Sequence, residues 1–206
     1  PHTVSLLFTT TVLTLISPFS LFALVFGLLA YLSVSSPSDL HMSSRILLGG
    51  GCFWGVQNYL QKKFPSIVTK VGYAGGRGAN PTYKEVCSGT TGHAEVVQVQ
   101  YDEAKVSTDT LLRYFFRIHN PTTLNYQGND RGTQYRSCIM PSTPEQKKVA
   151  QQVIEDLATD SAHTRAFPGP IVTTIEEDCP FYEAEEYHQD YLTANPGGYC
   201  NHRVYY

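Results

Sequence analysis

The heptapeptide Gly49-Gly50-Gly51-Cys52-Phe53-Trp54-Gly55 constrains the fold of this chain more than any other segment. The short apolar stretch 45–48 before it predicts a strand, and residues 56–64 after it have the apolar spacing of a helix face. Glycine permits the sharp turn that such a junction needs. We therefore expect Cys52 at the N-terminus of a helix, with its sulfur open to a substrate.

A reactive thiol is the interpretation that this position favours. Free backbone N–H groups and the helix dipole favour a thiolate there, and Phe53 and Trp54 offer an apolar wall for a methyl-sized group. A cysteine is more often a small core residue, but a core residue needs neither the glycines nor the helix start. Phosphate binding is excluded because Val56, and not a lysine, follows Gly55.

The composition narrows the function classes further. The chain has 206 residues and a net charge of −3, without the clustered Lys and Arg of a nucleic-acid footprint. Its 7 histidines and 5 cysteines lack metal-ligand spacing, so we expect neither a metal nor a cofactor. An odd number of cysteines argues against a closed disulfide framework and for at least one working thiol.

The first part of the chain differs from the rest. Residues 1–38 contain no charged side chain, and the apolar stretch 3–34 is long enough to span a bilayer. It could be a membrane anchor, a secretory signal or an extension that the mature protein lacks, whereas initiation at Met42 would give a soluble protein. We expect residues 39–206 to form the catalytic domain, in the cytoplasm unless the N-terminal segment anchors or exports it.

Strands and helices mix along the remaining sequence. Apolar periodicity and turn residues predict strands at 45–48, 67–73, 93–101, 133–139 and 171–175, and helices at 56–64, 108–119, 143–159 and 181–194. This mixture predicts an α+β fold: a two-layer sandwich with a mixed, mainly antiparallel sheet packed by helices, of the ferredoxin-like or α-β plait kind.

Glu95 is a candidate proton donor. In the strand 93–101 it shares a face with Val97 and Val99, which predicts that it is buried. A buried carboxyl without a cation beside it has a raised pKa, and its neutral form can donate a proton. The alternative is a glutamate at a strand end that reaches solvent, and Val96 on the opposite face weakens the alternation.

Three further polar residues lie next to predicted turns: Tyr83, Asp130 and Tyr135. Each by itself is more often structural than functional. The dense polar run 130–137 at the start of a strand is more typical of a site lining than of a core. As a set, these side chains could hydrogen-bond a polar oxygen or hold Glu95.

Several segments between Ile46 and Arg203 occur in the order of a known family. They are Gly50-Gly51-Cys52-Phe53-Trp54-Gly55, Gly72-Tyr73-Ala74-Gly75-Gly76, Asn80-Pro81-Thr82-Tyr83, Gly92-His93-Ala94-Glu95-Val96, Asp130 with Gly132-Thr133-Gln134-Tyr135-Arg136-Ser137, and Tyr187-His188-Gln189. The sequence resembles the A-type methionine-S-sulfoxide reductases. Nothing in residues 1–42 matches them. Asn120 replaces the aspartate of many members, and the short tail lacks the additional recycling cysteine of some.

The resemblance implies a role for each candidate. Cys52 would attack the sulfoxide sulfur and Glu95 would protonate the oxygen. Tyr83 and Tyr135 would hydrogen-bond that oxygen, with Asp130 supporting the network. The enzyme would be a monomer that reduces methionine sulfoxide, free or in proteins, to methionine. This reaction would repair oxidative damage.

Recycling needs a second thiol, because the reaction leaves Cys52 as a sulfenic acid. Cys200 follows the glycine-containing stretch 195–199, which allows movement, and matches the family's resolving position. The other cysteines, at 87, 138 and 179, fall in or beside predicted elements, where we expect them to be buried and held. The resemblance implies thioredoxin as the reductant, and Phe53 and Trp54 as the pocket for the substrate methyl.

Two other functions fit parts of the pattern. A cysteine hydrolase would need a histidine base near Cys52, for which His93 or His188 could serve. A membrane-anchored binding module would hold a thioether or methylated ligand in the aromatic pocket without turnover. Turnover of a sulfoxide with dithiothreitol separates the reductase from both.

Overall fold

The computed structural model describes residues 43–206, so the expectations for segments 1–38 and 3–34 lie outside the described residues. At its centre is a six-stranded sheet with the order β7-β6-β1-β3-β2-β8. The strands are β1 Ser44–Gly50, β2 Val68–Ala74, β3 Ala94–Tyr101, β6 Ser137–Pro141, β7 Thr174–Ile175 and β8 Tyr182–Glu183, and β4 Tyr126–Gln127 pairs separately with β5 Asp130–Arg131.

The helices are α2 Phe53–Lys63, α3 Tyr83–Cys87, α4 Thr108–Ile118, α5 Pro144–Thr159, α6 Ser161–Ala166 and α7 Tyr191–Ala194, with 3-10 turns η2 Thr133–Tyr135 and η3 Glu186–His188. The four central strands are antiparallel neighbours, and they occur in the chain order β1-α2-β2-β3-α4-β6. This is the ferredoxin-like plait. The edge strand β7 runs parallel to β6, so the predicted mixed, mainly antiparallel sheet and two-layer sandwich are confirmed.

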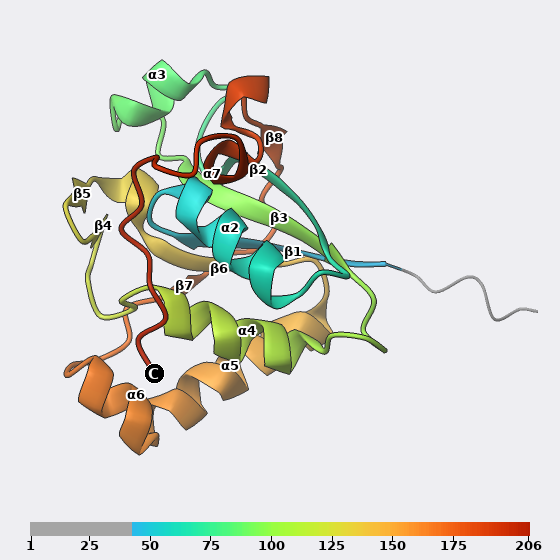
Figure 1. The fold of residues 1–206 in the computed structure, drawn as a ribbon, viewed down its shortest axis with the longest axis vertical. Helices are drawn as coiled ribbons and strands as arrows, with labels where there is room; N and C mark the ends of the chain where they lie inside the picture. Colours follow the sequence, from blue (N-terminus) through green and yellow to red (C-terminus); the bar gives the residue numbers. More distant parts are fainter. Residues whose placement is uncertain (1–42) are drawn as a thin grey trace, which may run out of the picture. The chain divides into compact units, whose positions relative to one another are not determined.

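The helices cover one face of the sheet, as Figure 1 shows for α2 and α4, with α5 beyond α4. The larger core lies on this side and contains Leu48, Val97 and Phe115. Because side chains alternate along a strand, their neighbours Leu47 and Val96 enter a second, smaller cluster that also contains Cys138 and Met140.

Most of the predicted elements match the observed ones, and the predictions for residues 133–135 and 181–194 do not. Residues 133–135 form a 3-10 turn instead of a strand, because Gly132 (φ 135°) turns the chain and accepts from the Tyr135 N–H. The predicted helix 181–194 was also wrong. Tyr182 pairs with the edge of β2, and Asp190 has a left-handed backbone (φ 51°) that interrupts a helix.

Within residues 43–206, no helix combines the length and apolar character required to cross a bilayer. The C-terminal tail runs from α7 past α2 towards α4 and α6 (Figure 1). Its end is held there, because the Tyr205 N–H donates to the Arg117 carbonyl and the Tyr206 hydroxyl lies 2.8 Å from Nδ1 of His163.

Candidate active site

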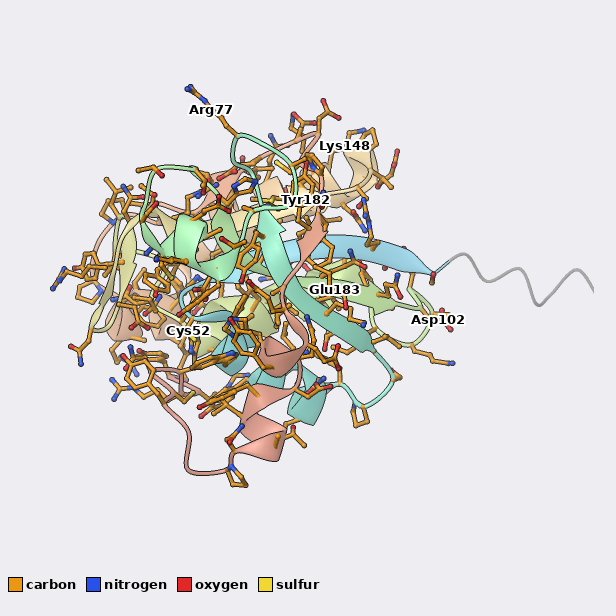
Figure 2. All side chains as sticks on the ribbon, turned by 90° about the horizontal axis from the view of Figure 1, so that it is seen from above. Cys52, Arg77, Asp102, Lys148, Tyr182 and Glu183 are labelled. Carbon is orange, nitrogen blue, oxygen red and sulfur yellow. The ribbon has the colours of Figure 1, made fainter. Side chains whose placement is uncertain are left out.

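One end of the sheet collects the predicted site residues. Cys52 follows the C-terminal end of β1, and Glu95 lies at the start of the antiparallel β3, where Leu48 pairs with Val97. Tyr135 lies just before β6. Asp102, which follows β3, marks the opposite end of the sheet, far from Cys52 in Figure 2. The strand register therefore brings together residues that are distant in the sequence.

Cys52 caps the N-terminus of α2, as the glycine motif predicts. Gly51 has φ 97°, a conformation that glycine adopts without strain. The Cys52 side chain is 9% exposed, and the backbone N–H of Phe53 donates to Oε2 of Glu95 at 3.1 Å. The first free N–H of the helix thus joins the turn that carries Cys52 to the carboxyl group of Glu95.

Glu95 is buried, being 1% exposed, so the alternative of a solvent-facing glutamate is wrong. Burial raises its pKa to about 8, the Phe53 N–H lowers that pKa, and the charge of Asp130 raises it. The acid therefore holds its proton through most of the neutral range, which suits a proton donor.

The expected thiolate at Cys52 needs correction. Burial raises the pKa of the Cys52 thiol well above its usual range, and the neighbouring Glu95 raises it further. The backbone N–H groups of Trp54 and Gly55 lower this pKa, as a helix start should, but desolvation is the larger effect. The resting sulfur is therefore a thiol.

Tyr83 and Tyr135 are both half-buried, the first at the start of α3 and the second at the end of η2. Burial raises the pKa of each phenol, and the charge of Glu95 contributes to both shifts. Both hydroxyls therefore stay protonated at neutral pH and can donate a hydrogen bond. The backbone N–H of Tyr83 donates to Glu185 at 2.9 Å, which fixes the start of α3.

Asp130 is the first residue of β5, and its oxygens bond to the C-terminal tail. The Tyr199 hydroxyl donates to Oδ1 at 3.0 Å, and Nδ2 of Asn201 donates to Oδ2 at 2.9 Å. Its charge still reaches the site, since it contributes to the raised pKa values of Glu95 and Cys52.

Phe53 and Trp54 differ in exposure. Phe53 is 1% exposed and packs on Tyr73 and His188, with ring centroids 6.0 Å and 5.1 Å apart. Trp54 is half-buried; its indole stacks on Tyr191 at 3.8 Å, and its Nε1 donates to Nδ1 of His188 at 3.1 Å. Of the two rings, Trp54 is therefore the one that is exposed in part.

His188 organises this aromatic cluster, a role that was not predicted from the sequence. Its ring contacts those of Phe53, Trp54, Tyr83 and Tyr187. The segment Tyr187-His188-Gln189 was the available signal, because it lies among the matching family motifs. The polar partners of Asp130 in the tail were also missed, and no spacing in the sequence signals them.

Neither histidine of the hydrolase alternative bonds to Cys52. His188 Nδ1 accepts from Trp54, while its Nε2 and both ring nitrogens of His93 have no hydrogen-bond partner. A cysteine hydrolase needs a base in contact with its sulfur. Residues 43–206 also hold no group of His, Cys, Asp and Glu arranged for a metal ion.

All cysteines of the described part of the chain are free thiols. Cys138 is buried as expected and Cys179 is half-buried, but Cys87 is exposed, so its predicted burial was wrong. The reason is that α3 is a short surface helix that ends at Cys87. Cys200 is exposed in the tail.

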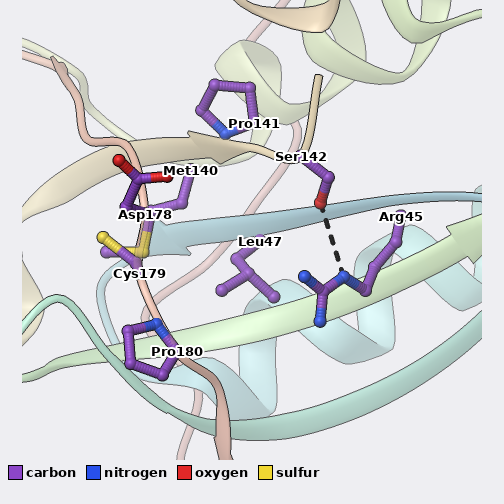
Figure 3. Close-up of a pocket in the computed structure, with 8 residues that line it drawn as sticks. All are labelled: Arg45, Leu47, Met140, Pro141, Ser142, Asp178, Cys179 and Pro180. Carbon is purple, nitrogen blue, oxygen red and sulfur yellow. Dashed lines mark hydrogen bonds between the residues drawn. The ribbon is translucent and has the colours of Figure 1, made fainter.

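A hollow of about 400 Å³ lies on the face of the sheet away from α2 (Figure 3). It is lined by Arg45, Leu47, Met140, Pro141, Ser142, Asp178, Cys179 and Pro180, and Arg45 donates to Ser142 across one side. None of the predicted site residues lines it, so the site at Cys52 and this hollow are separate features.

Comparisons with known proteins agree with this arrangement. The family model for peptide methionine sulfoxide reductase matches residues 44–206. A peptide methionine sulfoxide reductase MsrA of Clostridium botulinum (strain Kyoto / Type A2) is 51% identical over 157 residues, which cover 76% of this chain and 96% of that protein.

Two solved structures are similar as well. Mxr1 from Saccharomyces cerevisiae in reduced form matches with a TM-score of 0.72 at 38% identity, covering 82% of this chain and 93% of that chain. Mxr1 in complex with Trx2 matches with a TM-score of 0.55 at 26% identity, covering 84% and 97%.

Together the fold, the site and these matches define an oxidoreductase that reduces oxidised methionine by thiol chemistry. Within that class, the chain belongs to the peptide methionine sulfoxide reductase family, in its A type. The resemblance found in the sequence and the enzyme class that it implies are confirmed.

Proposed function

We propose that this enzyme reduces the S epimer of methionine sulfoxide and that Cys52 is its nucleophile. The observation that carries the proposal is the hydrogen bond from the Phe53 N–H, one residue after Cys52, to the buried Glu95. This bond holds the Glu95 carboxyl group beside the peptide that follows Cys52. When Cys52 attacks a sulfoxide sulfur, the oxygen on that sulfur is therefore within reach of Glu95.

The proton balance follows from the raised pKa values. Cys52 attacks the sulfoxide sulfur and loses its thiol proton while Glu95 gives its own proton to the oxygen. This attack forms a bond between the two sulfurs, and Glu95 takes up the proton lost by Cys52. The S–O bond to the substrate and the new S–S bond then break as the hydroxyl oxygen bonds to the Cys52 sulfur, so that methionine leaves and Cys52 becomes a sulfenic acid. The acid is regenerated, so burial of both groups is compatible with turnover at neutral pH.

Tyr83 and Tyr135 donate hydrogen bonds to the oxygen as negative charge develops on it, which stabilises the transition state. Burial raises the pKa of Glu95, and the charge of Asp130 raises it further. Trp54, with Phe53 packed behind it, holds the substrate methyl. Such a fixed arrangement accepts one sulfoxide epimer, and the other epimer requires a separate enzyme.

Recycling proceeds through a disulfide between Cys52 and Cys200, which thioredoxin reduces. The exposure of Cys200 supports its assignment, and the complex of Mxr1 from Saccharomyces cerevisiae with Trx2 supports thioredoxin as the reductant. We further propose that the catalytic domain, residues 39–206, acts as a monomer on free or protein-bound methionine sulfoxide, in the cytoplasm unless the N-terminal segment anchors or exports the protein.

Turnover of the separate R and S epimers of a methionine sulfoxide derivative, with dithiothreitol supplied, tests the proposal. We expect the S epimer alone to be reduced. Cys52→Ser should abolish this activity and Cys179→Ser, at the distant hollow, should leave it unchanged. Reduction of the R epimer, or substantial activity of Cys52→Ser, would contradict the proposal.

A further inference from the structure

The segment that carries Cys200 is attached to Asp130 on both sides of the cysteine. Tyr199 donates to one carboxylate oxygen at 3.0 Å and Asn201 to the other at 2.9 Å, and Asn201 also donates to the Tyr199 hydroxyl. We call these three residues, Asp130, Tyr199 and Asn201, the Asp130 clamp. Hydrogen bonds to a charged group are stronger than neutral ones, so the clamp holds the segment in one position.

A second attachment lies one residue further along. His202 is 6% exposed, and its Nε2 lies 2.8 Å from the Gly50 carbonyl oxygen, which can only accept. A Cβ atom at Gly55 would lie 2.1 Å from Nδ1 of this ring, so the glycine provides the space for it. The tail is therefore also anchored, at His202, on the turn that carries Cys52.

Cys200 lies between the two tail residues of the clamp, Tyr199 and Asn201. Its sulfur lies 3.9 Å from the carbonyl of His202, and its proximity adds to the effect of burial on the pKa of Tyr59. Tyr59 follows Cys52 by two turns of α2, about 10 Å along the helix axis. Cys200 and Cys52 are both free thiols in this state.

We infer that Tyr199 and Asn201 are positioning residues for the recycling step, and that both must release Asp130 before Cys200 can reach Cys52. The inference rests on the proposed function. In that step the Cys52 sulfenic acid and the Cys200 thiol form the S–S bond, the S–O bond breaks, and the thiol proton leaves with the hydroxyl as water. A disulfide requires Cα atoms within about 7 Å and a set geometry of the two sulfurs, and the two thiols are unbonded while the clamp holds the segment. The clamp then keeps the site open to substrate until the sulfenic acid has formed.

The test compares the two chemical steps in Tyr199→Phe, Asn201→Ala and the double variant. Each enzyme receives one equivalent of the S-sulfoxide without reductant, and quenched samples are assayed for methionine and for the Cys52–Cys200 disulfide. Tyr199→Phe removes one donor and keeps the ring, which protects the fold. Asn195→Ala, which removes an exposed amide bonded to the Tyr191 carbonyl, is the matched control.

We expect methionine to form at the wild-type rate in every variant. Disulfide formation should accelerate by roughly tenfold in the double variant, which corresponds to about 1.4 kcal/mol of barrier, and less in each single variant. Unchanged or slower disulfide formation would overturn the inference, and so would a parallel loss of methionine formation. If the wild-type enzyme forms methionine but no Cys52–Cys200 disulfide, the assignment of Cys200 in the proposed function fails instead, and the inference fails with it.

Discussion

Replacing Glu95 by glutamine removes the proton that the mechanism delivers to the sulfoxide oxygen. Burial raises the pKa of Glu95 from 4.5 to about 8. The active, protonated form therefore makes up about 90% of the enzyme at pH 7 and about 10% at pH 9. Because the acid is needed in its neutral form, the rate of sulfoxide reduction in the native enzyme should fall as pH rises through about 8.

Glutamine has nearly the same shape and still accepts from the Phe53 N–H, so Glu95→Gln should fold normally. It cannot release a proton, and loss of a general acid costs about 10²–10⁴ in rate. Because the variant has no carboxyl group that titrates at this position, the decline of its rate near pH 8 should also disappear.

The assay measures methionine formation in a single turnover by rapid quenching. It is repeated at values from about pH 6 to about pH 10. Glu183→Gln is the matched control. Glu183 lies on the edge strand β8, and its half-exposed carboxylate is bonded to Lys70. A native enzyme whose rate does not change across this range, or a Glu95→Gln variant with the native rate, would refute the reasoning.

Three other outcomes are expected. Cys52→Ser should fold but form no methionine with excess dithiothreitol, and a measurable rate would remove Cys52 from its role. Trp54→Ala should raise KM and lower the free energy of unfolding by about 3 kcal/mol, because the stacking on Tyr191 and the bond to His188 are lost. A destabilised variant with a normal KM would show that Trp54 is a core residue only. A chain that starts at Met42 should be fully active, and a folded but inactive truncation would contradict the assignment of residues 1–38 as dispensable.

The sequence contained enough information for the fold class and for the position of Cys52. The helix face of α4, the Thr143 cap of α5 and the glycines before α2 are local signals, and local contacts decide those elements. The burial of Glu95 also followed from strand alternation, since Val97 and Val99 share its face in the core.

Features that depend on long-range contacts could not be predicted in this way. Residues 181–194 carry a helical pattern, yet two long-range contacts decide their structure. Tyr182 pairs with β2, and Gln189 accepts from the Val71 N–H through Oε1 and donates to the Val71 carbonyl through Nε2. The raised pKa of the Cys52 thiol depends on how deeply the helix start is buried beside Glu95. Sequence periodicity predicts neither these long-range contacts nor the depth of burial at Cys52.

The pairing of cysteines after one turnover tests the central claim most directly. The enzyme is treated with one equivalent of the S-sulfoxide without reductant, digested, and its disulfides are mapped by mass spectrometry. We predict one methionine per enzyme and a Cys52–Cys200 disulfide, while Cys200→Ser should form the same methionine, retain a sulfenic acid at Cys52 and fail to cycle with thioredoxin. A disulfide from Cys52 to the exposed Cys87, or methionine formation that leaves Cys52 unmodified, would contradict the account.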